Sequence, residues 1–458
     1  MTPKTVECTL NFLYYGTAPS FKQNYSPFFI NLLSRYMKKF IQKIICMLVL
    51  ASTTSLFCTQ EFIKKTHEIN QHSLTKPLKK IIIFTSKGGF WHMAACDALI
   101  HILSPHHDVS IVNPIENILH PYDFVKTISG GLIDGEQFYD WLLQNNWISV
   151  SNILYKYVVP NILQIATESK VALIFDYLSK EKPDLVISVI PWLNLFISNA
   201  AHRLSVPFLL ITPDSDLTTW WVLGLDKMTH DNFMVAIGVE TKKTRPVLNA
   251  CGISNERIRH VGLLIRPDFL EKKDKEKIRA TWDIPADKFV IMVMMGGAGS
   301  FASYKYAQKI ASMNLNIHLL ICIGKNEKLI EKISQIPLQK EVTLSCIPFT
   351  NKISDLMAVS DLLITKPGPG SVNEALYSEL PMLIDKTGPC LFWEDGNVDL
   401  VKENQWGDVV TSFDQLEEMI KKYMEKNYYE RVKQALRSHD RKDFSKNIMQ
   451  MIAQLCPP

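Results

Sequence analysis

Short apolar runs alternate with longer amphipathic segments along most of this 458-residue chain. Two series of apolar runs follow residue 80, at 81–85, 109–112, 185–190, 208–211 and 233–237, and then at 289–295, 317–323, 342–347, 362–365 and 382–384. Runs that are apolar throughout, rather than alternating with polar residues, are typical of strands buried on both faces of a parallel sheet. The segments between them are long enough for crossover helices. The pattern predicts an α/β protein with two doubly wound, Rossmann-like domains.

A highly charged segment at residues 271–279, EKKDKEKIR, separates the two series. We interpret it as a solvated helix near a hinge. It divides the chain into an extension of residues 1–78, a first domain of residues 79–270 and a second domain of residues 271–458. Because ligands of doubly wound folds bind at the carboxyl ends of the strands, two facing domains predict a site in the cleft between them.

The N-terminal extension contains a basic stretch followed by a short apolar one. Four basic residues between positions 35 and 43 precede the apolar residues 44–51 and then small residues up to 58. This layout is similar to a signal sequence that begins at Met37. The stretch is short for a membrane span, and serines and threonines interrupt it. Three interpretations remain open: a cleaved export signal, a short membrane anchor and an amphipathic interfacial segment.

Composition excludes several classes of protein. The formal charge is +4, so bulk electrostatics give no reason to expect a nucleic-acid partner. The nine cysteines form no CxxC pair, and the histidines are not spaced as metal ligands. We therefore expect a thiol-containing intracellular protein without a metal site, a disulfide framework or a bound cofactor.

Three glycine-containing segments follow predicted strands: TSKGGFWHMAACDAL at 85–99, MMGGAGSFASYKYA at 294–307 and TKPGPGSVNEAL at 365–376. None of them fits the dinucleotide fingerprint well, and no GxxxxGK[ST] motif for nucleoside triphosphates occurs. In the third segment, the spacing of Ser371 and Glu374 predicts a capping box that begins a helix. Helix N-termini attract anions. This segment alone leaves two interpretations open, a phosphate-binding loop and a plain strand-to-helix turn.

Several segments match the sequence patterns of one enzyme family. TKPGPGSVNEAL is similar to a TKxGPGTxxEAL pattern, EDGNVDLVKENQWG from residue 394 to QExGNVxxVxxNGxG, and HVGLLIRPDF from residue 260 to GIPVRPxF. From residue 347, IPFTNKISDLMAVSDLLIT matches a GFVxNMxxxMxxxD pattern. Over residues 80–430 the chain resembles the GT-B glycosyltransferases of family 28, most closely the monogalactosyl- and glucosyl-diacylglycerol synthases. The resemblance implies a GT-B fold, with two Rossmann-like domains facing a cleft.

The resemblance also implies a donor site for a uridine diphosphate (UDP) sugar in the second domain. Glu374 would bind the ribose hydroxyls, and Glu394 and Asn397 would meet the sugar or its flanking groups. The uracil would be held largely by backbone groups of Phe349, Thr350 and Asn351. The residues expected beside the diphosphate are Gly296, Gly297, Ser300, Gly368, Gly370 and Ser371.

In the first domain, His92 matches the histidine that ends the family's GGGH loop and is its usual candidate for activating the acceptor. Asp216 falls where the family has a TD segment, and it is the second candidate base or orienting group. A neutral imidazole near physiological pH suits proton abstraction. On motif reasoning alone, the alternative that His92 is an ordinary polar residue of the first helix turn stays open. Asp216 can equally belong to a turn.

The first glycine loop departs from the family pattern. Gly88 and Gly89 are present, but Phe90 and Trp91 stand where two further glycines are expected. The bulky pair could close the loop, change the acceptor or mark a loss of activity. Arg266 could contact a phosphate of the donor or of an anionic lipid, since a guanidinium suits that geometry. A structural ion pair at the domain junction is an equal alternative for Arg266.

Residues 138–158 are rich in tryptophan, tyrosine and leucine. In the resembled family this part of the first domain faces the membrane and takes the lipid acceptor, and interfacial tryptophans agree with that. We expect most of these side chains to be core. Lys366 is expected to be a cation of the loop without a specific role.

The resemblance implies metal-independent transfer of galactose or glucose from a UDP sugar to diacylglycerol or a related lipid, with inversion. A UDP-sugar epimerase of the same fold and a degenerate member that binds a nucleotide sugar or a membrane without transfer remain alternatives. Sugar nucleotides are cytosolic, yet the basic residues before position 44 would orient a true anchor with the body outside. We therefore expect an interfacial segment or a misassigned start site, and an enzyme associated with the cytoplasmic face of a membrane.

Overall fold

The computed structural model describes residues 78–457 except 88–89, 146, 215–218 and 298. The signal-like segment at 37–58 lies outside the described residues. The described chain belongs to two compact units, of which the larger holds residues 78–124 and 134–457. Val125–Ile133 belongs to the other unit, where Ser129 Oγ donates a hydrogen bond to the Ile133 carbonyl at 2.9 Å.

Six parallel strands form the first sheet, in the order β2-β1-β3-β4-β5-β6. Their bounds are β1 (Lys80–Phe84), β2 (Asp108–Val112), β3 (Leu185–Ser188), β4 (Phe208–Thr212), β5 (Phe233–Ile237) and β6 (Ile258–His260). The five strands predicted from apolar runs are confirmed, and β6 was missed. The chain passes from β1 to β2 on one side, returns to β3 on the other side of β1, and then adds β4, β5 and β6 outward, which is the doubly wound arrangement.

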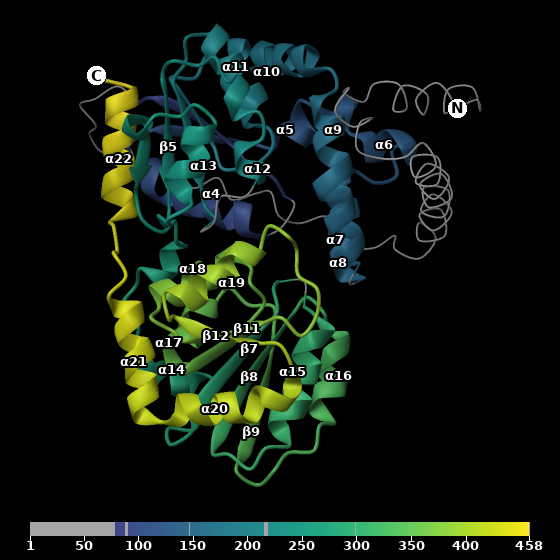
Figure 1. Cartoon of the computed structure of the whole chain (residues 1–458), viewed down its shortest axis with the longest axis vertical. Coiled ribbons are helices and arrows are strands. Elements are labelled where there is room, and N and C mark those ends of the chain that lie inside the picture. The colour runs from purple at the N-terminus through teal and green to yellow at the C-terminus, as the bar shows by residue number, and fades with distance from the viewer. Residues whose placement is uncertain (1–77, 88–89, 146, 215–218, 298, 458) are drawn as a thin grey trace. The chain divides into compact units, whose positions relative to one another are not determined.

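Helices cover both faces of the first sheet (Figure 1). The helices of this part of the larger unit are α4 (Phe90–Leu103), α5 (Pro114–Asn117), α7 (Gly135–Gln144), α8 (Ile148–Ile153), α9 (Val159–Gln164), α10 (Thr167–Glu181), α11 (Asn194–Arg203), α12 (Thr219–Val222) and α13 (Thr244–Ala250). A further helix, α6 (Phe124–Ile128), falls almost wholly in the other unit. Alternate residues of one strand enter different cores. Ile82 and Phe84 pack with α10 and α11, whereas Ile81 and Ile83 pack with α4.

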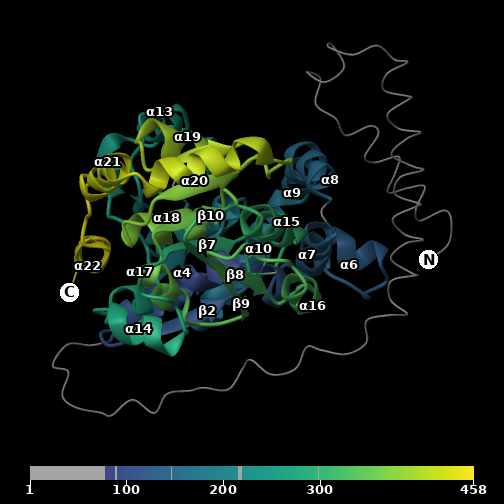
Figure 2. The same ribbon diagram turned by 90° about the horizontal axis from the view of Figure 1, so that it is seen from below.

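The second sheet is also six-stranded and parallel, in the order β12-β11-β10-β7-β8-β9. Its strands are β7 (Phe289–Met294), β8 (Ile317–Gly324), β9 (Val342–Pro348), β10 (Leu362–Thr365), β11 (Met382–Asp385) and β12 (Gly407–Val410). The five predicted strands are again confirmed, and β12 was missed. Figure 2 shows α15 (Phe301–Ala311) and α16 (Lys328–Ser334) on one side of the strands and α17 (Ile353–Val359) and α18 (Pro369–Tyr377) on the other. The remaining helices are α14 (Lys275–Thr281), α19 (Asp395–Glu403), α20 (Leu416–Met424), α21 (Lys426–Arg437) and α22 (Phe444–Leu455).

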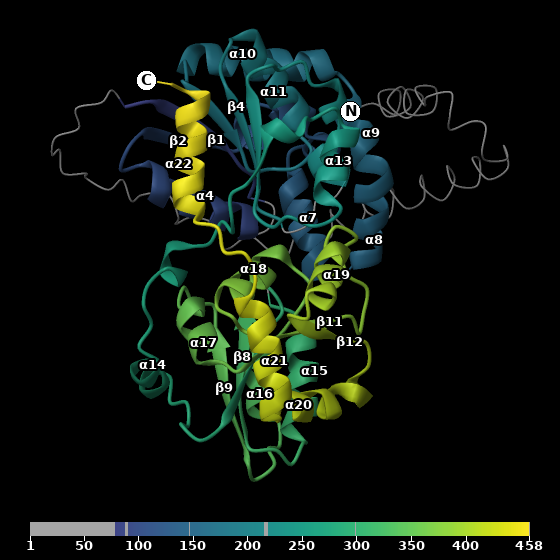
Figure 3. The ribbon, with the colours of Figure 1, turned by 60° about the vertical axis from the view of Figure 1, so that its left-hand side comes forward.

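The last helix, α22, returns to the first sheet (Figure 3). Its buried residues Ile448 and Ile452 share a core with β1, β3 and α4. Asn447 Nδ2 donates to the Val261 carbonyl at 3.1 Å. Gly262 adopts φ +99°, and a Cβ there would lie 2.4 Å from the Lys442 carbonyl oxygen, so the return path needs a glycine. A simple division of the chain at residue 271 therefore does not account for α22.

Candidate functional site

The third glycine segment joins β10 to α18, as the sequence predicts, but the helix begins earlier than expected. Gly368 is the N-cap, without a side-chain cap, and Pro369 is the first helical residue. Proline suits this position because its missing N–H would be unpaired there in any case. The predicted capping box of Ser371 and Glu374 is therefore wrong. The amides of Gly370 and Ser371 lie in the first turn, where a helix offers no acceptor of its own, and they can bind an anion.

Glu374 lies one turn into α18 and is paired with Arg266. Arg266 Nε donates to Glu374 Oε1 at 2.7 Å, and the two side chains are 24% and 6% exposed respectively. Burial raises the pKa of Glu374, and the guanidinium opposes that shift. Within the described residues no group donates to Glu374 Oε2. The ion-pair alternative for Arg266 is therefore confirmed, with Glu374 as the partner that the sequence did not name. The pair leaves the second carboxylate oxygen of Glu374 for a ligand.

A second ion pair lies beside the first turn of α18. Lys366 Nζ donates to Glu394 Oε1 at 2.8 Å, and the carboxylate is only 6% exposed. A Cβ on Gly296 or on Gly368 would lie 3.2 or 3.3 Å from Lys366 Cε, so this side chain lies against two glycine loops. Sequence reasoning missed its role, although its place directly before the loop was a signal. A cation at this point suits the charge of a diphosphate.

Asn397 supports the same loop from α19. Its Nδ2 donates to the Pro367 carbonyl at 2.8 Å, and the residue is 1% exposed. The structure thus gathers Glu394 and Asn397 around the start of α18, as the resemblance implies. The contact with the sugar that we predict for both residues stays a prediction.

In the second glycine loop, residues 296–299, close backbone packing requires at least one of the glycines. A Cβ on Gly299 would lie 1.9 Å from the Ile323 carbonyl oxygen, at a φ of +77°. Lys325 N donates to the Gly297 carbonyl at 3.1 Å. Ser300 caps α15 by accepting from Ala302 N at 3.2 Å. These glycines let the loop pack tightly against the end of β8, which the sequence interpretation, centred on a ligand, did not foresee.

Trp91 of the first domain lies directly on the loop that begins α18 in the second domain. A Cβ on Gly370 would lie 2.6 Å from Trp91 Cε3, so the indole contacts the bare Cα of the glycine. Trp91 Nε1 donates to the Pro213 carbonyl at 3.2 Å, and Asn373 Nδ2 of α18 donates to the same oxygen at 2.9 Å. The residues after β1, β4 and β10 therefore meet at one carbonyl. The departure from the family pattern at residue 91 lies at this junction.

A backbone carbonyl determines the tautomer of the His92 ring. Its Nδ1 lies 3.0 Å from the Val189 carbonyl oxygen. Since a carbonyl can only accept, Nδ1 carries the proton and Nε2 is left as the basic nitrogen. Burial lowers the pKa of His92 to about 4, so the ring is neutral at pH 7. This tautomer is the one that a proton acceptor requires.

The other predicted residues of the first domain are only partly described. Asp216, Gly88 and Gly89 lie outside the described residues. The neighbouring Asp214 accepts a hydrogen bond from Trp221 Nε1 at 2.6 Å, and the Trp221 ring lies 6.3 Å from the His92 ring. Asp214, in the described part of the TD-like segment, is therefore linked to His92 by the buried Trp221, which donates to Asp214 and lies beside the His92 ring.

The predicted uracil segment follows β9 on the second sheet. Phe349 is 48% exposed, and Lys325 Nζ lies 5.4 Å from the centre of its ring. Thr350 Oγ1 accepts from Lys352 N at 3.1 Å, in the turn that precedes α17. The segment through Asn351 thus lies at the carboxyl end of the sheet, on the same edge as the start of α18. Its role stays a prediction.

Residues 138–158 contact the segment that leads into Glu394. Asn152 Nδ2 donates to the Cys390 carbonyl at 2.8 Å, and its Oδ1 accepts from Phe392 N at 3.0 Å. The rings of Tyr139 and Tyr155 lie 6.2 and 5.8 Å from the ring of Trp393. Sequence reasoning missed Asn152, because nothing local to an asparagine shows that its partner is 240 residues away.

The aromatic-rich region is divided between core and surface. Tyr155 is 8% exposed, whereas Ile153 and Tyr157 are 58% and 61% exposed. No single helix in the described ranges is long and apolar enough to cross a membrane. Ile148–Gln164 with Thr167–Glu181, bent by 74°, meets the length and composition criteria only as a pair. Among the described residues no group of three or more His, Cys, Asp or Glu side chains could hold a metal ion.

Comparison with known proteins gives a family for the second domain. Residues 290–384 match the glycosyltransferase family 28 C-terminal domain. This span includes both glycine loops of the second domain and Glu374. The chain is thus a glycosyltransferase of the GT-B fold, with two Rossmann-like domains, as predicted.

Individual relatives are distant. The chain is 23% identical over 390 residues to a processive diacylglycerol β-glucosyltransferase of Bacillus pumilus, covering 82% of this chain and 95% of the relative. A protein of the same name from Bacillus cytotoxicus is 24% identical over 46% of this chain and about half (53%) of its own length. The crystal structure of Acinetobacter baumannii MurG superimposes with a TM-score of 0.56 at 12% identity, covering 82% of this chain and all of that one. The structural likeness shows the GT-B fold alone.

Proposed function

We propose that this family 28 protein transfers glucose or galactose from a UDP sugar to diacylglycerol or a related lipid, with inversion. The observation that carries the proposal is the start of α18. There, the first-turn amides of Gly370 and Ser371, the Lys366 ammonium and the Glu374 carboxylate lie together at the carboxyl end of β10. The named relatives are diacylglycerol glucosyltransferases, which supports the choice of acceptor.

The second domain supplies groups for the donor. A diphosphate at the start of α18 would accept from the amides of Gly370 and Ser371 and would be attracted by the helix dipole. Lys366 Nζ, which already donates to Glu394 Oε1, would donate a further hydrogen bond to the diphosphate. Glu374 Oε2 would accept from a ribose hydroxyl, while Arg266 holds the other carboxylate oxygen. A leaving UDP is more negative than the bound donor, so these groups stabilise it most as the bond breaks.

The first domain supplies the base. The acceptor hydroxyl oxygen attacks the anomeric carbon and forms the new glycosidic bond. The bond from that carbon to the diphosphate oxygen breaks, and UDP leaves with the electron pair. The hydroxyl proton passes to Nε2 of His92, which is unprotonated because Nδ1 donates to the Val189 carbonyl. A single displacement of this kind inverts the anomeric centre.

The acceptor lipid is proposed to approach along residues 138–158. Exposed Ile153 and Tyr157 offer apolar contact, and Lys156 lies between the ends of α8 and α9. Apolar and aromatic side chains beside lysine favour a membrane interface. We propose association with the cytoplasmic face, where sugar nucleotides are made. Neither a metal nor another cofactor is needed for this step.

One observation favours a second candidate. Trp91 lies on Gly370, beside the amides that the diphosphate would use. A protein locked in this arrangement would bind a nucleotide sugar weakly and transfer nothing. The alternative of a degenerate member therefore stays open until activity is measured.

The test is transfer of radiolabel from UDP-glucose or UDP-galactose into vesicles that contain diacylglycerol. We expect labelled lipid with the wild-type chain and a loss of at least a hundredfold with His92→Ala. Glu374→Gln should weaken UDP binding measured by calorimetry. Tight UDP binding without label in lipid would overturn the proposed acceptor, and the appearance of a second UDP sugar without lipid would indicate an epimerase. Absence of both label and UDP binding, even in Trp91→Gly, would overturn the donor site.

A further inference from the structure

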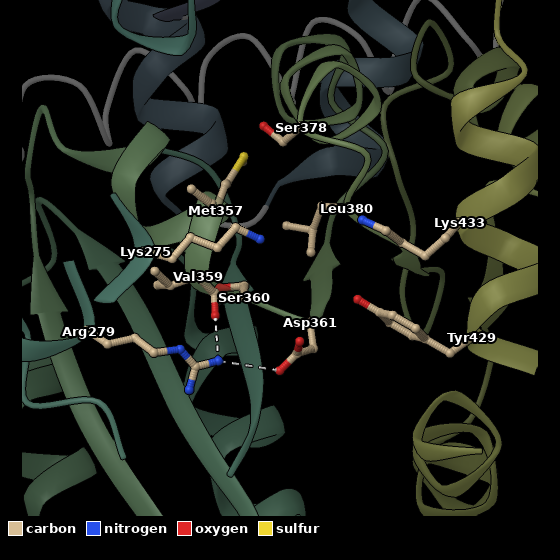
Figure 4. Close-up of a pocket in the computed structure, with 11 residues that line it drawn as sticks. Lys275, Arg279, Met357, Val359, Ser360, Asp361, Ser378, Leu380, Tyr429 and Lys433 are labelled. Carbon is tan, nitrogen blue, oxygen red and sulfur yellow. Dashed lines mark hydrogen bonds and ion pairs between the residues drawn. The ribbon is translucent and has the colours of Figure 1, made fainter. Parts of the chain in front are cut away.

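A small polar pocket lies at the amino ends of the strands of the second sheet (Figure 4). It encloses about 360 Å³, open solvent included, where α14, α21 and the turn before β10 meet. Asp361 lines it and immediately precedes β10, whereas the candidate donor loop follows Thr365 at the other end of that strand. The pocket is therefore separate from the site described above.

Positive side chains outnumber negative ones in the lining. Lys275 and Arg279 come from α14 and Lys433 from α21, and Asp361 is the one acidic residue that lines the pocket. Figure 4 shows the amino groups of Lys275 and Lys433 pointing into the space between the two helices, with the Tyr429 hydroxyl below them. Three cations against one carboxylate give the pocket a net positive charge.

The single carboxylate is already engaged by the fold. Asp361 Oδ2 accepts from Val290 N at 2.8 Å and lies 3.9 Å from Arg279 Nη2. Arg279 in turn donates to the carbonyls of Pro285 and Val359 at 2.8 and 3.3 Å. These two side chains neutralise and fix each other, so the remaining charge in the pocket is that of the two lysines.

Neither lysine has an acidic partner. In the part of the chain that the structure describes, no carboxylate lies within 4.0 Å of Lys275 Nζ or Lys433 Nζ. Lys433 Nζ donates to the backbone carbonyl of Glu379 at 2.6 Å, while the carboxylate of Glu379 pairs with Arg437 and Arg441. Burial lowers the pKa of Lys433; Arg437 and Lys275 add to this effect, whereas the carboxylates of Glu379 and Glu430 oppose it. Two converging ammonium groups, beside a hydroxyl donor, are a receptor for an anion.

We propose that this pocket binds a phosphate group, either inorganic phosphate or the headgroup of an anionic lipid. The oxygens would accept from Lys275, Lys433 and the Tyr429 hydroxyl. Phosphate offers several acceptor oxygens and two negative charges near neutral pH, which matches the two unpaired lysines. The proposal does not depend on the reaction assigned to the other edge of the sheet.

Calorimetric titration of the full chain with inorganic phosphate tests the first source. Lys275→Gln is the informative variant because, among the described residues, its side chain makes no hydrogen bond or ion pair in the fold. We expect it to weaken phosphate binding by about tenfold, and Lys275→Gln with Lys433→Gln by more. Lys277→Gln on the same helix, also exposed and outside the pocket, is the matched control and should leave binding unchanged.

Flotation with phosphatidylcholine vesicles, with and without phosphatidic acid, tests the second source. Binding that needs phosphatidic acid and falls in Lys275→Gln, but not in Lys277→Gln, assigns the pocket to a lipid headgroup. Phosphate binding with that same dependence, but no vesicle binding, assigns it to free phosphate. Equal behaviour of wild type and Lys275→Gln in both experiments would overturn the proposal. Phosphate held at the donor site would be insensitive to Lys275, so the two sites are distinguishable.

Discussion

Gly370→Ala is predicted to be unfavourable for a reason that lies in the other domain. The new Cβ would fall 2.6 Å from Trp91 Cε3 and 3.1 Å from Cδ2, which are ring-fusion atoms or their neighbours rather than a flexible chain end. The indole cannot easily move, because its Nε1 is bonded to the Pro213 carbonyl. Overpacking of this kind costs about 1–3 kcal/mol. In a domain of 150–250 residues, that corresponds to roughly 2–12 °C in the melting temperature.

A double-mutant cycle isolates the contact. Trp91→Ala removes the obstacle, so Gly370→Ala in that background should cost no more than about 0.5 kcal/mol. Urea unfolding of the four proteins, followed by tryptophan fluorescence and circular dichroism, gives the coupling energy. An equal cost of Gly370→Ala in both backgrounds would refute the reasoning, since it would show that glycine is needed at 370 for the loop itself. Gly388→Ala is a matched control, because a Cβ there meets nothing within 4 Å.

Three further predictions follow from the site. Burial lowers the pKa of His92 to about 4, whereas the unfolded chain has a pKa of about 6.5 there, so the protein loses stability as the pH falls from 6.5 towards 4. His92→Gln should reduce the slope of the unfolding free energy against pH in that window by about 1.4 kcal/mol per pH unit. An unchanged slope would contradict this. Arg266→Met should lower the free energy of unfolding, measured by thermal unfolding, by about 3 kcal/mol, because it leaves the Glu374 carboxylate buried and unpaired. A loss of stability near zero would mean that Glu374 is protonated and neutral. Asn152→Ala should lower the free energy of unfolding by about 1–3 kcal/mol and speed hydrogen exchange at the Phe392 amide. Unchanged exchange there would mean that Asn152 does not hold the segment before Glu394 in place.

The sequence predicts most of the fold because apolar runs of the central strands are strong signals. The two strands that it missed, β6 and β12, are only three and four residues long and lie at sheet edges. The start of α18 was misjudged because Ser371 and Glu374 have capping-box spacing, yet the N-cap is Gly368, three residues before Ser371. Local spacing cannot decide between two competing starts.

The site was predictable only where a motif marks it. Glu374, Glu394 and the glycine loops are recognisable from their patterns, and the structure brings them together. The partners that fix them, such as Arg266 on Glu374 and Asn152 on the segment before Glu394, are 108 and about 240 residues distant in the chain. Contacts at such separation are set by tertiary packing, which no local pattern encodes.

The return of α22 to the first sheet has a consequence for how the protein is made. Ile81, Ile83 and Ile187 share a core with Ile448 and Ile452 of that helix. During synthesis the first domain emerges long before α22, so this apolar face is covered only in part, by α4, while the whole second domain is translated. Completing this core requires closure of a loop that spans nearly the whole described chain, which is slow. A chain that stops before residue 444 should display this face to chaperones and to other nascent copies.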